Sequence, residues 1–313
     1  MANLTKGMLV ENTACPQWGP GKIVHVDDRL HIVFRDLEEE AKKYPIGSPC
    51  LRLATAQSDP ILDNLPPLHE KGGSWMLPSK RLNLESLKRR FLYEFPAGFA
   101  DPKYFDQECD YKLAAHVKFQ EILGLEHARD LLKEGQFRSL ATKGLQVLGA
   151  VNLLSPYESA AFHDAMQNDD AVRAFFTSLL NVLDADPLSP SIFDEYVEAV
   201  TSLPADRSRV ATWPVATVFP YLASPDRYMF LKPEVTKEAA NSMAFDLQYG
   251  ATPNWTTYQA LLNMGTVYLE LLRPLGARDY LDVQSFIYVT CGGYGNAPAN
   301  AKSKRQPATA ETP

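Results

Sequence analysis

The chain has 313 residues, of which 45% are hydrophobic and 11% aromatic, and its formal net charge is −7. This composition supports a hydrophobic core and excludes global disorder. The length indicates two domains, or one domain with an appendage. The acidic balance argues against a protein coated with nucleic acid, but it allows local basic patches.

Four cysteines, Cys15, Cys50, Cys109 and Cys291, are far apart in the sequence and form no CxxC pair. We therefore expect neither a disulfide framework nor a zinc site, and we predict no metal and no other cofactor. The sequence has no apolar run of the about 20 residues that a membrane helix needs, and its first residues show no signal-peptide pattern. The expected location is the cytoplasm.

Residues 8–53 have the rhythm of short β-strands. Alternating residues at 22–26 and 30–34 predict a hairpin, and residues 50–53 supply a strand that closes a small barrel. Residues 16–24 (PQWGPGKIV) and the return strand resemble CarD-like and Tudor-like modules, including those at the C-termini of UvrD-type helicases. This resemblance implies an SH3/Tudor-like β-barrel over residues 1–56. Its implied role is to dock on RNA polymerase, nucleic acid or a neighbouring domain.

Residues 57–82 are rich in proline and glycine and predict a linker or a surface strap. A group of basic residues follows beside an apolar stripe, and these side chains are candidates for contacts to a nucleic-acid backbone. The alternative is that they form the solvated face of a helix. They are Lys80, Arg81, Lys88, Arg89 and Arg90.

Residues 83–291 follow a helical pattern, so the predicted fold is mainly α with a small N-terminal β-barrel. One helix covers residues 172–183, with Asp169 or Asp170 as its N-cap. Ser189 begins another helix, residues 256–259 form a capping box, and Asp279 caps the last helix. Residues 292–313 predict a disordered tail.

Residues 212–241 predict an apolar helix, a turn at 224–226, a short strand-like segment and a helix from Pro233. With the late helix at 282–291, this order resembles the second half of the helix-hairpin-helix DNA glycosylase superfamily. In that family a loop delivers a catalytic aspartate at a helix N-terminus. Here the glycine-rich hairpin is absent, and Pro233, preceded by Lys232, stands where the family has its aspartate. The family's catalytic residue therefore does not carry over.

Two other residues near this turn have the required chemistry. A carboxylate stabilises the cationic sugar of a breaking glycosidic bond, and a lysine amine can attack the sugar carbon instead. Asp226 and Lys232 are the predicted catalytic pair; the alternative is a turn cap with an ion-paired lysine. Candidates for binding a flipped base are Trp213, Tyr221, Tyr228, Trp255, Tyr258 and Gln284, although aromatic residues at helical spacing are more often core. Arg209 and Lys237 are further candidates for contacts to the DNA backbone.

The leading functional hypothesis is a DNA glycosylase that excises a modified or damaged base and leaves an abasic site. This hypothesis includes a possible role in defence against phage DNA that carries modified bases. The expected partners are DNA and, for the barrel, a possible protein. The first alternative is a non-enzymatic adaptor that docks on RNA polymerase, DNA or a protein. The second is a nuclease or other metal enzyme. It requires that folding bring carboxylates together, and the sequence contains no metal-binding motif.

Overall fold

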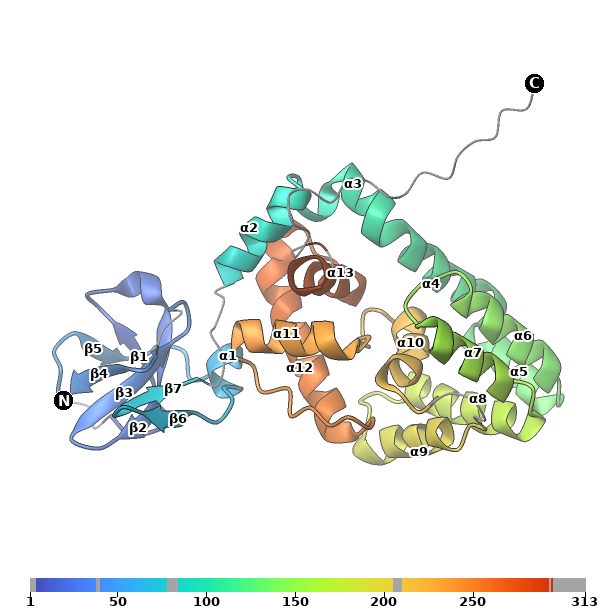
Figure 1. The fold of residues 1–313 in the computed structure, drawn as a ribbon, viewed down its shortest axis with the longest axis horizontal. Coiled ribbons are helices and arrows are strands. Elements are labelled where there is room, and N and C mark those ends of the chain that lie inside the picture. Colours follow the sequence, from blue (N-terminus) through green and yellow to red (C-terminus); the bar gives the residue numbers. More distant parts are fainter. Residues whose placement is uncertain (1–3, 38–39, 78–83, 205–209, 293, 295–313) are drawn as a thin grey trace, which may run out of the picture.

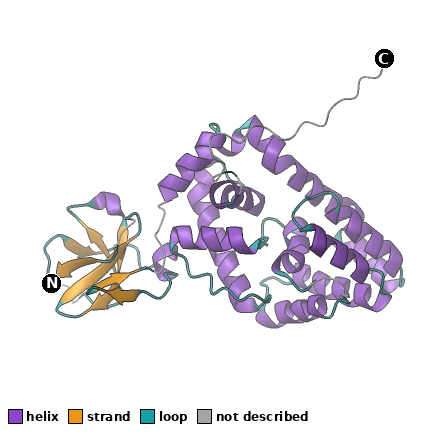
Figure 2. Cartoon of the chain, in the orientation of Figure 1, coloured by secondary structure: helices purple, strands orange, loops and turns teal. Residues whose placement is uncertain are grey.

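The computed structural model describes residues 4–292 and 294, except 38–39, 78–83 and 205–209. The predicted fold class is confirmed: a small antiparallel sheet lies at one end and a larger helical part at the other (Figure 1). Figure 2 shows the strands gathered in the N-terminal part alone. Lys80, Arg81, Arg209 and all of the predicted tail except residues 292 and 294 lie outside the described residues.

Five antiparallel strands form a curled half-barrel in the order β4-β3-β2-β1-β5. The strands are β1 (Leu9–Asn12), β2 (Pro20–Val26), β3 (Arg29–Phe34), β4 (Lys42–Pro45) and β5 (Leu51–Leu53). The predicted hairpin is confirmed because β2 pairs with β3. The strand at 51–53 pairs with β1, but β4 and β5 are the two edges of the sheet, so the predicted closure of the barrel is wrong. Gly21 is required because a Cβ atom there would lie 2.6 Å from Cγ2 of Ile32.

Residues 60–76 pack on this sheet. They form α1 (Pro60–Asp63) and the hairpin of β6 (His69–Lys71) with β7 (Ser74–Met76). The Trp75 carbonyl accepts a hydrogen bond from the Ala41 amide at 3.0 Å. The centre of the Trp75 ring lies 4.6 Å from the centre of the His25 ring. At the other side of α1, the Asp246 amide donates to the Asn64 carbonyl at 2.6 Å. This segment therefore joins the sheet to the helical part.

The helical part forms one hydrophobic core. Its helices are α2 (Leu84–Glu94), α3 (Pro102–Tyr104), α4 (Asp110–Leu123), α5 (Leu125–Lys133), α6 (Phe137–Leu148), α7 (Pro156–Ala165), α8 (Asp169–Asp184), α9 (Pro190–Thr201), α10 (Trp213–Ala223), α11 (Pro233–Met243), α12 (Trp255–Leu272) and α13 (Tyr280–Cys291). A π-helical turn, Phe105–Cys109, joins α3 to α4.

Two predicted helix starts are confirmed and two are wrong. The Ser189 hydroxyl caps α9, and the Asp279 carboxylate accepts hydrogen bonds from two amides of α13. The cap of α8 is Asn168, not Asp169 or Asp170, which already lie within the helix. Asn254 caps α12 by accepting from the Thr257 amide at 2.9 Å, so the capping box predicted at 256–259 is wrong. In both cases an asparagine just upstream has the extended backbone that a cap needs.

Helix α10 lies at the centre of the helical part, and all of its residues are buried. Side chains of α4 satisfy its last carbonyls: His116 bonds that of Leu222 and Gln120 donates to that of Ala223, each at 2.7 Å. The Thr217 hydroxyl of α10 accepts a hydrogen bond from the Leu231 amide at 3.0 Å. The structure assigns no strand to residues 228–232, all of which it describes, so the strand-like prediction there is wrong. A side chain, not a neighbouring strand, binds this extended segment.

Candidate active site

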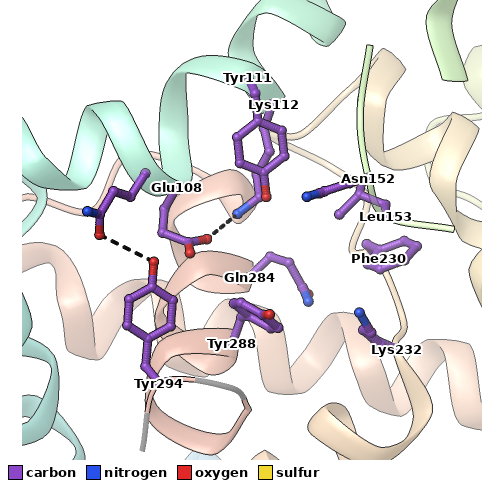
Figure 3. A pocket seen from close by; sticks show the side chains of 11 residues that line it. Glu108, Tyr111, Lys112, Asn152, Leu153, Phe230, Lys232, Gln284, Tyr288 and Tyr294 are labelled. Carbon is purple, nitrogen blue, oxygen red and sulfur yellow. Dashed lines mark hydrogen bonds and ion pairs between the residues drawn. The ribbon is translucent and has the colours of Figure 1, made fainter. Parts of the chain in front are cut away.

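The helical part contains a cavity of about 290 Å³, here called the central cavity. This volume is close to the lower limit of about 300 Å³ for small-molecule sites. Four walls form it: the π-turn with the start of α4, the loop between α6 and α7, the segment before α11, and the end of α13. Its lining residues are Gln107, Glu108, Tyr111, Lys112, Asn152, Leu153, Phe230, Lys232, Gln284, Tyr288 and Tyr294 (Figure 3).

The π-turn places a buried ion pair in the wall of the central cavity. Nζ of Lys112 lies 3.0 Å from Oε2 of Glu108 and 2.7 Å from Oγ of Ser285 in α13. The side chains of Lys112 and Glu108 are 2% and 4% exposed, so solvent screens their interaction little. Single-turn π-bulges occur often at functional sites, because they redirect side chains that a regular helix would aim elsewhere.

The wall formed by α13 is fixed by a second buried network. The Asp282 carboxylate is fully buried, accepts a hydrogen bond from the Tyr104 hydroxyl at 2.5 Å, and receives two more from the Arg278 guanidinium at 2.8 Å. Arg278 also donates to the Cys109 sulfur at 3.2 Å. This network ties α13 to α3 and the π-turn, and so it sets the distance between two walls of the cavity.

Lys232 is the N-cap residue of α11. Its amide donates to the Thr236 hydroxyl at 3.2 Å, and the preceding Leu231 amide is bound by Thr217. The Lys232 ammonium lies 5.6 Å from the centre of the Tyr288 ring, within cation–π range. Backbone and ring contacts therefore hold this amine at the cavity.

Gln284 brings a buried amide to the same space. Its side chain is 3% exposed, and its Oε1 atom is buried with no hydrogen-bond partner among the described residues. Figure 3 shows the ends of Asn152, Lys232 and Gln284 directed toward one space, with Phe230 and Tyr288 beside it. A buried carbonyl oxygen without a hydrogen-bond partner carries a cost in free energy.

Burial controls the protonation of several lining side chains. It lowers the pKa of Lys112, and the neighbouring Glu108 carboxylate opposes that change. Burial, followed by the charge of Glu108, raises the pKa of Tyr111 and of Tyr294. Both phenols thus remain neutral hydroxyl groups at neutral pH. With two lysines and one carboxylate, the lining favours an electron-rich ligand.

The structure separates the two predicted catalytic residues. Lys232 lines the central cavity, but Asp226 lies in the exposed turn between α10 and α11 and does not line it. Pairing Asp226 with Lys232 was therefore wrong. Turn residues point toward solvent unless a partner holds them, and this turn has its backbone bonds to Ser224 instead.

Most predicted base-binding aromatic residues belong to the core. Trp213 donates to the Gly250 carbonyl at 2.7 Å, and the Tyr228 hydroxyl donates to that of Val182 at 2.6 Å. The other three are Tyr221, fully buried in α10, Tyr258, stacked on Phe193 at 4.4 Å, and Trp255, which packs on the same Phe193. None of these five lines the central cavity, whereas Gln284 does. The core alternative is the right one for these rings.

The described basic candidates lie on two helices. On α2, Lys88 pairs with Glu85 at 3.1 Å, Arg89 donates to the Ser86 hydroxyl at 3.0 Å, and Arg90 donates to the Thr290 carbonyl. On α11, Lys237 pairs with Glu234 at 2.7 Å. Arg89 and Arg90 are exposed, so α2 offers a basic surface beside α13.

Sequence reasoning missed Glu108 and Lys112. An acidic and a basic residue four positions apart are usually a surface pair on a helix, and that pattern gave no reason to expect burial. The aromatic residues around them were the available signal, since Phe95, Phe99 and Tyr104 pack immediately upstream.

Within the described residues, no group of three or more His, Cys, Asp or Glu side chains is placed to hold a metal ion. In the same part of the chain, no helix is long and apolar enough to cross a membrane. No family model, no curated protein and no solved structure matches the chain.

Proposed function

We propose that this protein is a DNA glycosylase that excises a modified or damaged base, with the Lys232 amine as its nucleophile. The observation that supports this proposal is the composition of the central cavity. It joins one amine held at the cavity, the amide side chains of Asn152 and Gln284, and aromatic rings. A flipped base needs an edge partner and flat faces, and its sugar needs an attacking group.

In the proposed reaction, the Lys232 side chain loses a proton to solvent, its amine attacks the sugar carbon C1′, and the bond from C1′ to the base breaks. The resulting covalent adduct divides one difficult step into two easier ones. Gln284 and Asn152 bind the edge of the base, while Phe230 and Tyr288 pack against its faces. Glu108, and not Asp226, is the acidic side chain of the cavity lining, and its carboxylate is paired with Lys112 at 3.0 Å.

DNA approaches, in this proposal, along the basic surface of α2. Arg89 and Arg90 are exposed there, and α2 packs against α13, which carries Gln284 and Tyr288. Contacts to phosphates supply affinity independent of sequence and overcome the overall charge of −7 locally.

The direct test is incubation of the purified protein with DNA that bears modified bases, followed by mass spectrometry of released bases. Borohydride added during the reaction reduces a Schiff base between lysine and C1′ and leaves protein joined to DNA. We expect base release, a trapped complex and loss of both in Lys232→Ala. Lys133→Ala is the matched control, because Lys133 is an exposed lysine of α5, 76% exposed and remote from the lining.

Absence of base release from every DNA tested, with the protein folded, contradicts the proposal and favours the non-enzymatic adaptor. Base release without a trapped complex retains the glycosylase but removes Lys232 as the nucleophile. A water molecule would then be the attacking group.

A further inference from the structure

We infer that Lys112 is a second catalytic residue of this site, the general acid that protonates the departing base. This inference rests on the proposed function. It concerns a buried ammonium in the cavity wall that the proposed attack by Lys232 leaves unused.

The hydrogen bonds of Lys112 leave capacity for a substrate. A lysine ammonium has three N–H donors. One is directed to Glu108 at 3.0 Å and one to Ser285 at 2.7 Å. Nζ also lies 5.1 Å from the centre of the Tyr111 ring, which lines the cavity as well. The remaining N–H has no hydrogen-bond partner among the described residues, and Lys112 lines the cavity.

The position of Lys112 suits this role. Lys112 belongs to α4, whereas Lys232 precedes α11, and Figure 3 shows them on different walls. A nucleophile must reach the sugar and an acid must reach the base, so the two groups need separate walls. Burial, which disfavours the charged form, prepares Lys112 to give up a proton, and Glu108 stabilises the ammonium before transfer.

The step balances as follows. The Lys232 ammonium first releases one proton to solvent. The lone pair of the resulting amine then forms a bond to C1′, and the electron pair of the C1′–base bond moves to the base. The base takes a proton from Lys112, which becomes a neutral amine beside the Glu108 carboxylate. The adduct nitrogen then loses one of its protons and Lys112 takes one up. The net change is transfer of one proton from the Lys232 amine to the base, and water later releases the lysine.

A charge-free double variant, Glu108→Leu with Lys112→Met, tests this role. Replacing a buried ion pair by apolar residues of similar volume is often neutral or stabilising, so this variant is expected to fold. Lys112→Met alone leaves Glu108 buried without a partner and serves as the comparison for stability.

Two substrates distinguish departure of the base from formation of the Schiff base. One is DNA with an intact modified base, and the other is DNA with a preformed abasic site, whose aldehyde forms a Schiff base without any base departure. We expect the double variant to trap the abasic site with borohydride as the unmodified protein does. We expect its base release to fall by about 100-fold or more, the usual contribution of general acid catalysis.

Base release within about threefold of the unmodified protein overturns the acid role. Loss of trapping at the abasic site together with base release also overturns it, because the pair then only holds the site together. If the unmodified protein releases no base from any DNA, the proposed function fails and this inference fails with it. If the unmodified protein releases a base but the double variant does not lose base release as expected, the proposed function stands and only the acid role of Lys112 is rejected.

Discussion

Ile61 and Leu62 are adjacent in α1, but they lie in different hydrophobic cores. Ile61 packs into the core of the helical part, and Leu62 packs with Leu9 and Val33 under the curled sheet. Both are buried, at 4% and 0% exposure. One turn of helix therefore joins the two parts through two adjacent side chains that pack into different cores.

Truncating these two residues should loosen different parts of the protein. Leu62→Ala is expected to lower the free energy of unfolding by about 2–5 kcal/mol, through loss of buried methyl groups and the resulting cavity. Its hydrogen exchange should rise in β1 to β3. Ile61→Ala should have a cost of similar size but raise exchange near Met243 and Leu271, which line one pocket together with Ile61. Identical exchange patterns in the two variants would contradict the division between cores.

The Asp282 network gives a prediction about stability. Asp282→Asn removes a buried charge that Arg278 and Tyr104 bind, and breaking a fully buried pair costs about 3–5 kcal/mol. We expect about 2–3 kcal/mol in urea denaturation, because the Arg278 side chain is 46% exposed and solvent screens part of the interaction. Asp279→Asn is the matched control: asparagine is an equally good N-cap, so its effect should be within about 0.5 kcal/mol. Equal losses in both variants would show that the network adds nothing beyond helix capping.

Gln284 should show opposite effects on stability and function. Gln284→Leu removes a buried oxygen that has no partner, so the free energy of unfolding should stay the same or rise by up to about 1 kcal/mol. Base release under the proposed function should fall at least tenfold, because the edge of the base loses its partner. Gln259→Leu, at an exposed position of α12, should leave both quantities unchanged. A clear loss of stability in Gln284→Leu would indicate a structural role instead.

Buried tyrosines predict the response to alkaline pH. Burial raises the pKa of Tyr221, Tyr258 and Tyr268 well above the ordinary value of 10.0. Above that value the unfolded chain binds fewer protons than the folded protein, so stability is full below pH 10 and falls as pH rises further. Titration followed by phenolate absorbance should show exposed tyrosines ionising first and the buried ones only with global unfolding. A single smooth titration of all tyrosines before unfolding would contradict this expectation.

The basic surface of α2 predicts how DNA binding depends on salt. Arg89→Ala should weaken binding similarly for all DNA sequences and reduce the slope of log affinity against log salt by about 0.9, the value for one lost phosphate contact. Arg173→Ala on α8 is the control, since its side chain is 62% exposed and pairs with Asp170. Equal slopes for Arg89→Ala and the unmodified protein would place the DNA elsewhere.

The sequence predicted the elements better than the site. Periodicity gave the helices around Phe175 and Leu179, and alternation gave the hairpin of β2 and β3, because both patterns reflect which side faces a core. The chemistry of Lys232 and Gln284 predicts a site role for both, and both line the cavity. The same reasoning predicts a site role for Trp213 and Tyr221, yet both belong to the core, because chemistry alone does not tell which face of a helix meets a cavity.

The ion pair in the cavity wall could not be predicted for a different reason. Glu108 and Lys112 are local in sequence, but their burial depends on α13, which lies far along the chain. No local pattern reports that a distant helix will cover a charge. The N-caps of α8 and α12 were predicted wrongly for a simpler reason. Several residues that can cap a helix are adjacent there, and only the backbone conformation decides which of them is the N-cap.

The contact between Lys112 and Ser285 spans 173 residues, and this separation has a consequence for synthesis of the protein. A growing chain that has not yet emerged as far as α13 has the α4 wall but neither Gln284 nor Tyr288. Contacts so distant in sequence form late, after the intervening helices have folded. A partly made chain thus has no complete cavity, so the chemistry proposed here is switched on only when the last helix docks.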